Sequence, residues 1–212
     1  MSPPFSDDGA WEVGHDGGPA PQAPGTMDGM TAPADRPFRV LVVCTGNICR
    51  SPMGEVVLRE RLAEAGLDGA VEVASAGISD EEHGNPIDRR ARAVLAEHGY
   101  PVPHHRAHQV APHELADYDL ALAMTNQHAR ALRLRAERDA DPRTAEVRLW
   151  REFDDTAPEL ATAGEYDLDV PDPWYGDHGG FYDTLDVVER GADGLVAHLR
   201  ERLGDRAEKV SS

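Results

Sequence analysis

The sequence predicts a single α/β domain whose core is a mostly parallel sheet. Apolar segments of strand length alternate along the chain with longer segments whose apolar residues recur at helical spacing. A chain of 212 residues, 40% of them hydrophobic, is long enough to form one sizeable core. Alternating strands and helices pack as a sheet with helices on both faces, and ligands in such folds bind beyond the carboxyl ends of the strands.

The first strand is expected at Val40–Cys44, a short β-branched run. Ser51 is expected to cap the helix that follows, with Pro52 in its first helical position. Small and apolar residues continue at helical spacing to Ala65, and Gly66 provides a stop signal. This segment therefore predicts a strand, a tight loop and a helix in direct succession.

The remaining elements follow the same alternation. Further strands are expected at Val71–Val73, Tyr118–Met124 and Val147–Trp150. Further helices are expected from Pro86 to Gly99, from a capping Asn126 to about Arg138, and along a last apolar face made of Phe181, Leu185, Val188, Ala192, Leu195, Leu199 and Leu203. Gly191 and Gly194 should weaken the last helix by roughly 1 kcal/mol each if they are interior.

The ends of the chain differ in composition from its centre. Residues 1–37 hold seven of the sixteen prolines and six glycines, so we expect a disordered acidic tail, a domain at 38–204 and a flexible C-terminus at 205–212. Met27 and Met30 lie just before the expected domain, and the sequence leaves open whether translation starts there. No apolar run suits a signal peptide or a membrane span, which leads us to expect a cytoplasmic protein.

Charge and cysteine content exclude several classes of function. A formal net charge of −18 makes nucleic acid an unfavourable partner. Both cysteines, Cys44 and Cys49, lie in one loop, which excludes a disulfide framework and a zinc site of cysteine pairs. A loose histidine cluster is better explained by solvation or local hydrogen bonds than by metal binding, because no carboxylate or cysteine shares its spacing. Its members are His104, His105, His108 and His113.

The loop after the first strand has the composition of an anion site. Five residues separate Cys44 from Arg50, and among them Gly46 and Asn47 are the residue types that best tolerate left-handed backbone angles. Such a loop can turn its amides inward beside the positive end of the next helix, and Arg50 adds a planar fork that fits two phosphate oxygens. The same field favours the thiolate of Cys44, which makes this residue a candidate nucleophile.

The string Cys44-Thr-Gly-Asn-Ile-Cys-Arg-Ser-Pro52 resembles the C-x5-R-S signature of the low-molecular-weight protein tyrosine phosphatases of bacterial type. Ser75-Ala-Gly77, Gly84-Asn-Pro86, His98-Gly-Tyr100 and Asp172-Pro-Trp-Tyr-Gly176 recur in family order, so the resemblance covers roughly residues 38 to 203. It implies a four-stranded parallel sheet in the order 2-1-3-4. It also implies hydrolysis of phosphotyrosine or aryl phosphate through a phosphocysteine, without a metal or other cofactor.

The resemblance also assigns roles to individual residues. Phosphate would be held by Thr45, Gly46, Asn47, Ile48, Cys49 and Arg50. Asp172 is selected as general acid over Asp167, Asp169 and Asp177, because only Asp172 stands in the family's Asp-Pro motif. Ser51 is expected to hydrogen-bond the departing thiolate, and Asn47 to lock the loop through Ser75. For Cys49, a small buried hydrophobe and a redox partner that shields Cys44 remain equal alternatives.

Departures from the family pattern concern the rim of the site. Glu81 or Glu82 stands where family members commonly place an aromatic or large apolar wall, so a carboxylate there should oppose a phosphate dianion. Trp174 takes a position that is usually tyrosine, and with Tyr175 it keeps the opposite wall aromatic. Thr125 replaces an aspartate that is frequent in bacterial relatives, and the stretch from Asp139 to Glu146 is longer than usual.

Two other functions remain open. A protein arginine phosphatase of the same fold typically carries threonine where this chain has Ile48, so tyrosine or aryl phosphate is favoured. A phosphate- or phosphopeptide-binding module without turnover would fit the acidic rim. Arsenate reductases of this fold need further cysteines downstream, and this chain has none after Cys49. The expected partner is a phosphorylated protein or a small aryl phosphate, bound by a monomer.

Overall fold

The centre of the protein is a sheet of four parallel strands in the order β2-β1-β3-β4, seen in a computed structural model that describes residues 36–159, 162–176 and 178–210. The strands are β1 (Phe38–Cys44), β2 (Val71–Gly77), β3 (Leu120–Ala123) and β4 (Glu146–Leu149). In the register of the sheet, Val43 of β1 lies between Ala76 and Ala123. The predicted fold class and strand order are therefore confirmed.

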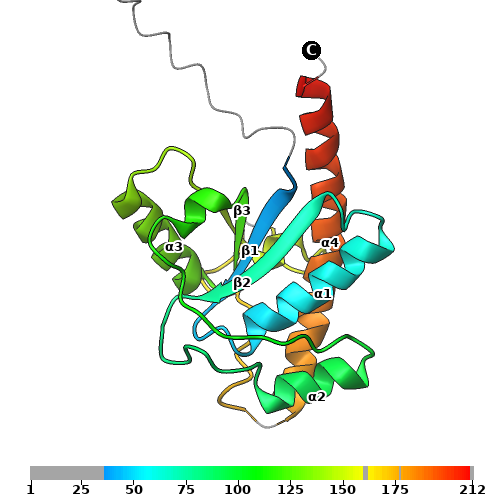
Figure 1. Ribbon diagram of the computed structural model, residues 1–212. Helices are drawn as coiled ribbons and strands as arrows, with labels where there is room; N and C mark the ends of the chain where they lie inside the picture. Colours follow the sequence, from blue (N-terminus) through cyan, green and yellow to red (C-terminus); the bar gives the residue numbers. More distant parts are fainter. Residues whose placement is uncertain (1–35, 160–161, 177, 211–212) are drawn as a thin grey trace, which may run out of the picture. The chain divides into compact units, whose positions relative to one another are not determined.

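Helices cover both faces of this sheet (Figure 1). The elements are α1 (Arg50–Glu64), α2 (Arg89–Glu97), the 3-10 turn η1 (Glu114–Asp117), α3 (Asn126–Asp139), the 3-10 turn η2 (Trp150–Phe153) and α4 (Gly179–Val210). Side chains alternate along β1, so that Val40 and Val42 pack under α1, α2 and α4, while Leu41 and Val43 pack under α3 and η1. The loop after β1 is thus held between two buried layers.

Three predicted helix starts are wrong. Helix α1 begins at Arg50 after Cys49 without a side-chain cap, so Ser51 lies inside the helix and its hydroxyl is free for other contacts. Thr125, not Asn126, caps α3 and accepts the backbone N–H of His128. The helix expected from Pro86 begins later, because Asp88 caps α2 by accepting the N–H of Arg90.

The expected strand ends also shift. The strand predicted at Val71–Val73 continues to Gly77. The strand predicted at Tyr118–Met124 is shorter and spans Leu120–Ala123. Trp150, predicted to end the fourth strand, lies in η2. Trp150 leaves the strand because its indole turns into the core, where Nε1 donates to the Val188 carbonyl at 3.2 Å. A buried hydrogen bond to α4 therefore outweighs the strand propensity of tryptophan at this position.

Gly191 and Gly194 explain how α4 can approach η2 so closely. A Cβ on Gly191 would overlap the Trp150 indole, and a Cβ on Gly194 would overlap the Phe153 carbonyl oxygen. Both glycines are interior to the helix, as the prediction of a weakened helix supposed. Their lower helix propensity is offset by packing that a larger residue would prevent.

The proposed tail and C-terminus fall mostly outside what the structure shows. Residues 1–35 of the predicted tail and residues 211–212 lie outside the described residues, so both boundaries stay predictions. Arg36 is described and forms an ion pair with Asp119 at 2.7 Å. Among the residues described, no helix combines the length and the apolar character that crossing a bilayer requires.

Candidate active site

The loop from Thr45 to Cys49 joins the carboxyl end of β1 to the first turn of α1. Asn47 adopts the predicted left-handed conformation, with φ at 59°. Gly46 serves a different purpose, because a Cβ at this position would lie 2.8 Å from Cγ of Glu82. The glycine thus permits the rim segment to approach the loop.

Asn47 is the centre of the hydrogen bonds that hold the loop. Its Nδ2 donates to Ser75 Oγ at 2.9 Å and to Ser51 Oγ at 3.0 Å, and its Oδ1 accepts the backbone N–H of His108. His105 Nε2 donates to the Asn47 carbonyl at 2.7 Å. The structure thus brings Asn47 and Ser75 together as predicted, and adds two residues of the histidine cluster as backbone supports.

Cys44 ends β1 with its sulfur at the base of the loop. Its Sγ lies 3.0 Å from Ser51 Oγ, and both residues are buried. Ser51 Oγ accepts the Asn47 amide and also lies 3.3 Å from the Ala76 carbonyl. The Ser51 hydroxyl thus accepts from Asn47 and has one proton to donate, either to the Ala76 carbonyl or to the sulfur of Cys44.

Arg50 and Asp172 face each other across the loop. Arg50 Nη2 donates to Asp172 Oδ2 at 2.7 Å, and the guanidinium is almost fully buried while Asp172 is partly exposed. Asp172 Oδ1 accepts the backbone N–H of Trp174 at 3.1 Å, which orients the carboxylate. A positive fork and a carboxylate therefore meet at the place where an anion above Cys44 would sit.

The competing aspartates of this segment have other partners. Asp169 accepts the N–H of Asn126 at 2.7 Å, and Asp167 accepts the N–H of Gly164 at 2.8 Å. Asp177 lies outside the described residues. The contacts thus separate Asp172, which lines the pocket, from two aspartates that organise the loop backbone.

A pocket of about 330 Å³ opens above Cys44 and brings together both halves of the predicted site. Its lining residues are Cys44, Thr45, Gly46, Ile48, Cys49, Arg50, Glu81, Glu82, Asp172, Trp174 and Tyr175. Tyr175 is 90% exposed and Trp174 is 43% exposed, so the aromatic side of the rim is open to solvent. Glu82 is held by Asn85, whose Nδ2 donates to Oε2 at 2.7 Å.

Cys49 is a neighbour of the nucleophile with different properties. Burial raises the pKa of the Cys49 thiol, and the charges of Asp88 and Cys44 raise it further. Both cysteines are free in the structure. A protonated, buried Cys49 agrees with its role as a small hydrophobe, whereas the redox role stays a prediction.

Two residues of the site were not singled out as part of it from the sequence. His128 is buried on α3 and contacts Thr45 Oγ1 through Nε2 at 3.0 Å, while Thr125 Oγ1 contacts its Nδ1 at 3.0 Å. Glu55 accepts a hydrogen bond from Ser75. Thr125 caps α3, and His128 follows three positions later in the first turn of this helix. This spacing is the local signal in the sequence that links the two residues.

Three members of the histidine cluster, His105, His108 and His113, have local contacts, the last with Asp139. Besides His105 on the loop, His108 Nε2 lies 3.2 Å from Glu114 Oε1, which raises the pKa of His108. Among the described residues, no group of three or more histidine, cysteine or acidic side chains is arranged to hold a metal ion.

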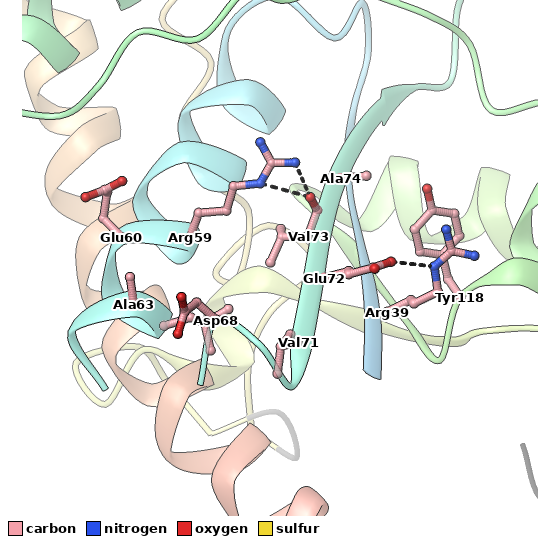
Figure 2. Close-up of a pocket in the computed structure, with 11 residues that line it drawn as sticks. Arg39, Arg59, Glu60, Ala63, Asp68, Val71, Glu72, Val73, Ala74 and Tyr118 are labelled. Carbon is pink, nitrogen blue, oxygen red and sulfur yellow. Dashed lines mark hydrogen bonds and ion pairs between the residues drawn. The ribbon is translucent and has the colours of Figure 1, made fainter. Parts of the chain in front are cut away.

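A larger cavity of about 550 Å³ lies away from Cys44, at the outer edge of β2 (Figure 2). Its two arginines are already engaged, because Arg59 donates to the Val73 carbonyl and Arg39 pairs with Glu72. Its lining contains acids and apolar side chains but neither cysteine. Size alone therefore does not identify the reactive site, and the chemistry favours the smaller pocket.

The smaller pocket combines a candidate nucleophile, a candidate charge clamp and a candidate proton donor, which are Cys44, Arg50 and Asp172. A cysteine sulfur at the base, loop amides at a helix N-terminus and a buried guanidinium suit displacement at a tetrahedral dianion. Asp172 lines the same pocket and is partly exposed, so it can reach a departing group.

Comparison with known proteins gives consistent matches. The family model of the low molecular weight phosphotyrosine protein phosphatases matches residues 39–205, which include every residue that lines the pocket. A low molecular weight protein-tyrosine-phosphatase from Streptomyces coelicolor is 47% identical over 172 residues, covering 80% of this chain and 98% of that protein. The crystal structure of YfkJ from Bacillus subtilis has a TM-score of 0.68 at 30% identity, covering 79% of this chain and 97% of that one. The YwlE arginine phosphatase from Geobacillus stearothermophilus has a TM-score of 0.63 at 29% identity, covering 80% and 97%.

Proposed function

The chain belongs to the low molecular weight phosphotyrosine protein phosphatase family, and we propose that it hydrolyses phosphotyrosine in proteins and small aryl phosphate monoesters. The observation that carries this proposal is the meeting of Cys44, Arg50 and Asp172 in one pocket. These three groups come from two segments that lie more than 120 residues apart in the sequence and are joined by the Arg50–Asp172 hydrogen bond.

In the first chemical step, the Cys44 thiolate attacks phosphorus and forms an S–P bond while the P–O bond to the leaving group breaks. The loop amides and Arg50 hold the equatorial oxygens, whose charge is largest in the transition state. Asp172 gives its proton to the departing oxygen. The incoming dianion competes with Asp172 for Arg50, which releases the carboxyl group to face the departing oxygen.

In the second step, water attacks the phosphocysteine and transfers a proton to the Asp172 carboxylate. The S–P bond breaks, and its electron pair returns to Cys44 as a thiolate. Ser51 Oγ, 3.0 Å from the sulfur, donates a hydrogen bond to this thiolate and thereby improves it as a leaving group. All the groups of the cycle come from this chain, which supports a monomer as the active form.

Phosphoarginine is the second candidate substrate, because one structural neighbour is an arginine phosphatase. Ile48 argues against this substrate. Its side chain is 8% exposed and lines the pocket, so it offers an apolar contact where a hydroxyl would be needed to bind the guanidinium of the substrate. The aromatic rim at Trp174 and Tyr175 favours a planar ring instead.

The two cysteines also bear on where in the cell the protein works. We propose a cytoplasmic enzyme, because both cysteines are free and the mechanism needs Cys44 reduced. The net charge of −18 disfavours nucleic acid as a partner.

The test compares wild type with Cys44→Ser on an aryl phosphate, and then compares phosphotyrosine with phosphoarginine peptides of the same sequence. Wild type should hydrolyse the aryl phosphate and prefer the phosphotyrosine peptide, and rapid acid quench should trap a labelled phosphocysteine. Turnover that survives in Cys44→Ser would exclude this mechanism. A preference for phosphoarginine would instead favour the second substrate.

A further inference from the structure

A row of three hydrogen-bonding side chains leads from the N-terminus of α3 to the mouth of the pocket. Thr125 Oγ1 contacts Nδ1 of His128 at 3.0 Å, and Nε2 of His128 contacts Thr45 Oγ1 at 3.0 Å. His128 is 2% exposed and Thr125 is 9% exposed, whereas Thr45 is exposed and lines the pocket. The row therefore joins the buried interior to the place where the substrate's phosphate is proposed to bind.

The cap of α3 determines the direction of the first hydrogen bond. Thr125 Oγ1 already accepts the backbone N–H of His128 at 3.3 Å. The Thr125 hydroxyl therefore donates its own proton to its remaining partner, Nδ1 of His128. A hydroxyl that accepted from both sides would leave its own proton without a partner among the contacts of the described residues. In a buried position, such an unsatisfied donor is unfavourable.

His128 has only one ring proton to place. Burial and, to a smaller extent, the positive charge of Arg50 lower the pKa of its imidazole to about 3, so the ring is neutral under physiological conditions. With Nδ1 accepting from Thr125, the proton sits on Nε2 and is donated to Thr45 Oγ1. The Thr45 hydroxyl proton is then free to point elsewhere.

We propose that His128 is a positioning residue, which as its Nε2–H tautomer makes the Thr45 hydroxyl donate a hydrogen bond into the phosphate pocket. This inference rests on the proposed function, since it assumes that a phosphoryl group binds above Cys44. Thr45 then adds a side-chain donor to the loop amides and Arg50. In the opposite tautomer, Nε2 would draw the Thr45 proton away and leave oxygen lone pairs facing the anion, which would repel it.

The ring tautomer can be observed directly in the wild-type protein. Long-range proton–nitrogen correlation spectra at neutral pH distinguish the two tautomers, and loss of one signal set in His128→Gln assigns His128 among the ten histidines. The expected result is a proton on Nε2 and none on Nδ1. A proton on Nδ1, or on both nitrogens, would overturn the proposal.

Binding of inorganic phosphate, measured by calorimetric titration, tests the consequence without reference to turnover. Thr45→Val should weaken phosphate binding about tenfold, because it removes a hydrogen bond to a charged group, and Thr45→Ser should restore most of the affinity. Thr125→Val should weaken binding in the same direction, with rescue by Thr125→Ser, which keeps the hydroxyl and the helix cap.

The double variant separates positioning from general damage. If His128 acts through the Thr45 hydroxyl, Thr125→Val should have little further effect on phosphate affinity in the Thr45→Val background. An equal effect in both backgrounds, or unchanged affinity in Thr45→Val, would overturn the proposal. If wild type binds phosphate and hydrolyses aryl phosphate normally, such a result defeats only the role of His128 and leaves the proposed function intact.

Discussion

The indole nitrogen of Trp150 fills the space beside Gly191 that any side chain at that position would need. The same nitrogen donates to the Val188 carbonyl one turn earlier in α4. We therefore expect Gly191→Ala to destabilise the protein by about 1–3 kcal/mol through overpacking, despite the better helix propensity of alanine. Urea unfolding of the two proteins measures the difference.

Gly204 provides the matched control, because it lies in the same helix and a Cβ added there would meet no atom within 4 Å. Gly204→Ala should be neutral or stabilising by up to about 1 kcal/mol. If both variants behave alike, close packing is not what the glycine at position 191 provides.

Arg50→Lys should reduce kcat/KM at least about a hundredfold, although the positive charge is retained. Lysine lacks the planar fork that binds two oxygens at once, and the fork acts most strongly on the charge of the transition state. Steady-state kinetics with an aryl phosphate measure the loss. Arg92→Lys, an exposed position on α2, is the control for a lysine substitution in general. Near wild-type kinetics in Arg50→Lys would mean that charge alone suffices.

Asp172→Asn should slow substrates with poor leaving groups far more than activated aryl phosphates, because only the former need full protonation of the departing oxygen. A series of aryl phosphates of graded leaving-group acidity measures this dependence. Asp169→Asn keeps an oxygen that can accept the Asn126 N–H and should leave this dependence as in wild type. A steep leaving-group dependence in Asp169→Asn but not in Asp172→Asn would show that the acid has been misassigned.

Glu81→Gln and Glu82→Gln should lower KM modestly, and more at low salt. A carboxylate roughly 8 Å from the dianion opposes it by about 2 kcal/mol at an effective dielectric near 20, and physiological salt reduces this to under about 1 kcal/mol. Tryptophan at either position should lower KM further for aryl phosphates only, through stacking. The kcat should remain near that of wild type, since neither residue is assigned to the chemical step.

Both glutamates line the pocket, but in the described contacts only the Glu82 carboxylate accepts a hydrogen bond from the Asn85 side chain. The change on Glu82→Gln should thus be the smaller if this partner holds the carboxylate away from the substrate. Unchanged KM for both positions at low salt would mean that the rim does not sense the dianion.

Removal of residues 1–35 should leave the melting temperature and aryl phosphatase activity nearly unchanged, since a proline- and glycine-rich segment has little apolar surface to offset its ordering entropy. The truncation should keep Arg36, whose ion pair with Asp119 is partly buried. Adding Arg36→Ala should then cost up to about 1 kcal/mol, measured by urea unfolding. A large loss on truncation alone would show that the tail contributes to the fold.

Much of the pocket could be predicted because its groups are concentrated in the sequence. Cys44 to Ser51 are eight consecutive residues, and Asp172 stands in a recognisable Asp-Pro pair. The helix starts were harder. Ser51 has the residue type of a cap, but its hydroxyl contacts the sulfur of Cys44 and the amide of Asn47 instead, which local propensity cannot reveal.

Contacts between distant segments set the other limit. His128 reaches Thr45 across 83 positions, and Trp150 reaches α4 across 38, so neither contact has a signature in a local window. From the sequence, Gly191 is only a weak helix former. Its contribution to packing depends on the Trp150 indole, which fills the space where a Cβ would lie. The sequence thus predicts the side chains of the pocket better than it predicts the distant residues that orient them.

In the free protein, the Asp172 carboxylate is paired with Arg50 and therefore competes with any other anion for this guanidinium. Any anion that enters must displace a carboxylate that lies 2.7 Å from the guanidinium, so substrate and released phosphate both lose the same free energy of binding. A phosphorylated ring recovers part of this loss from the aromatic rim, whereas free phosphate has no such contact. On the proposed mechanism, we therefore expect the Asp172 carboxylate to speed the release of phosphate after each turnover and to weaken inhibition by this product.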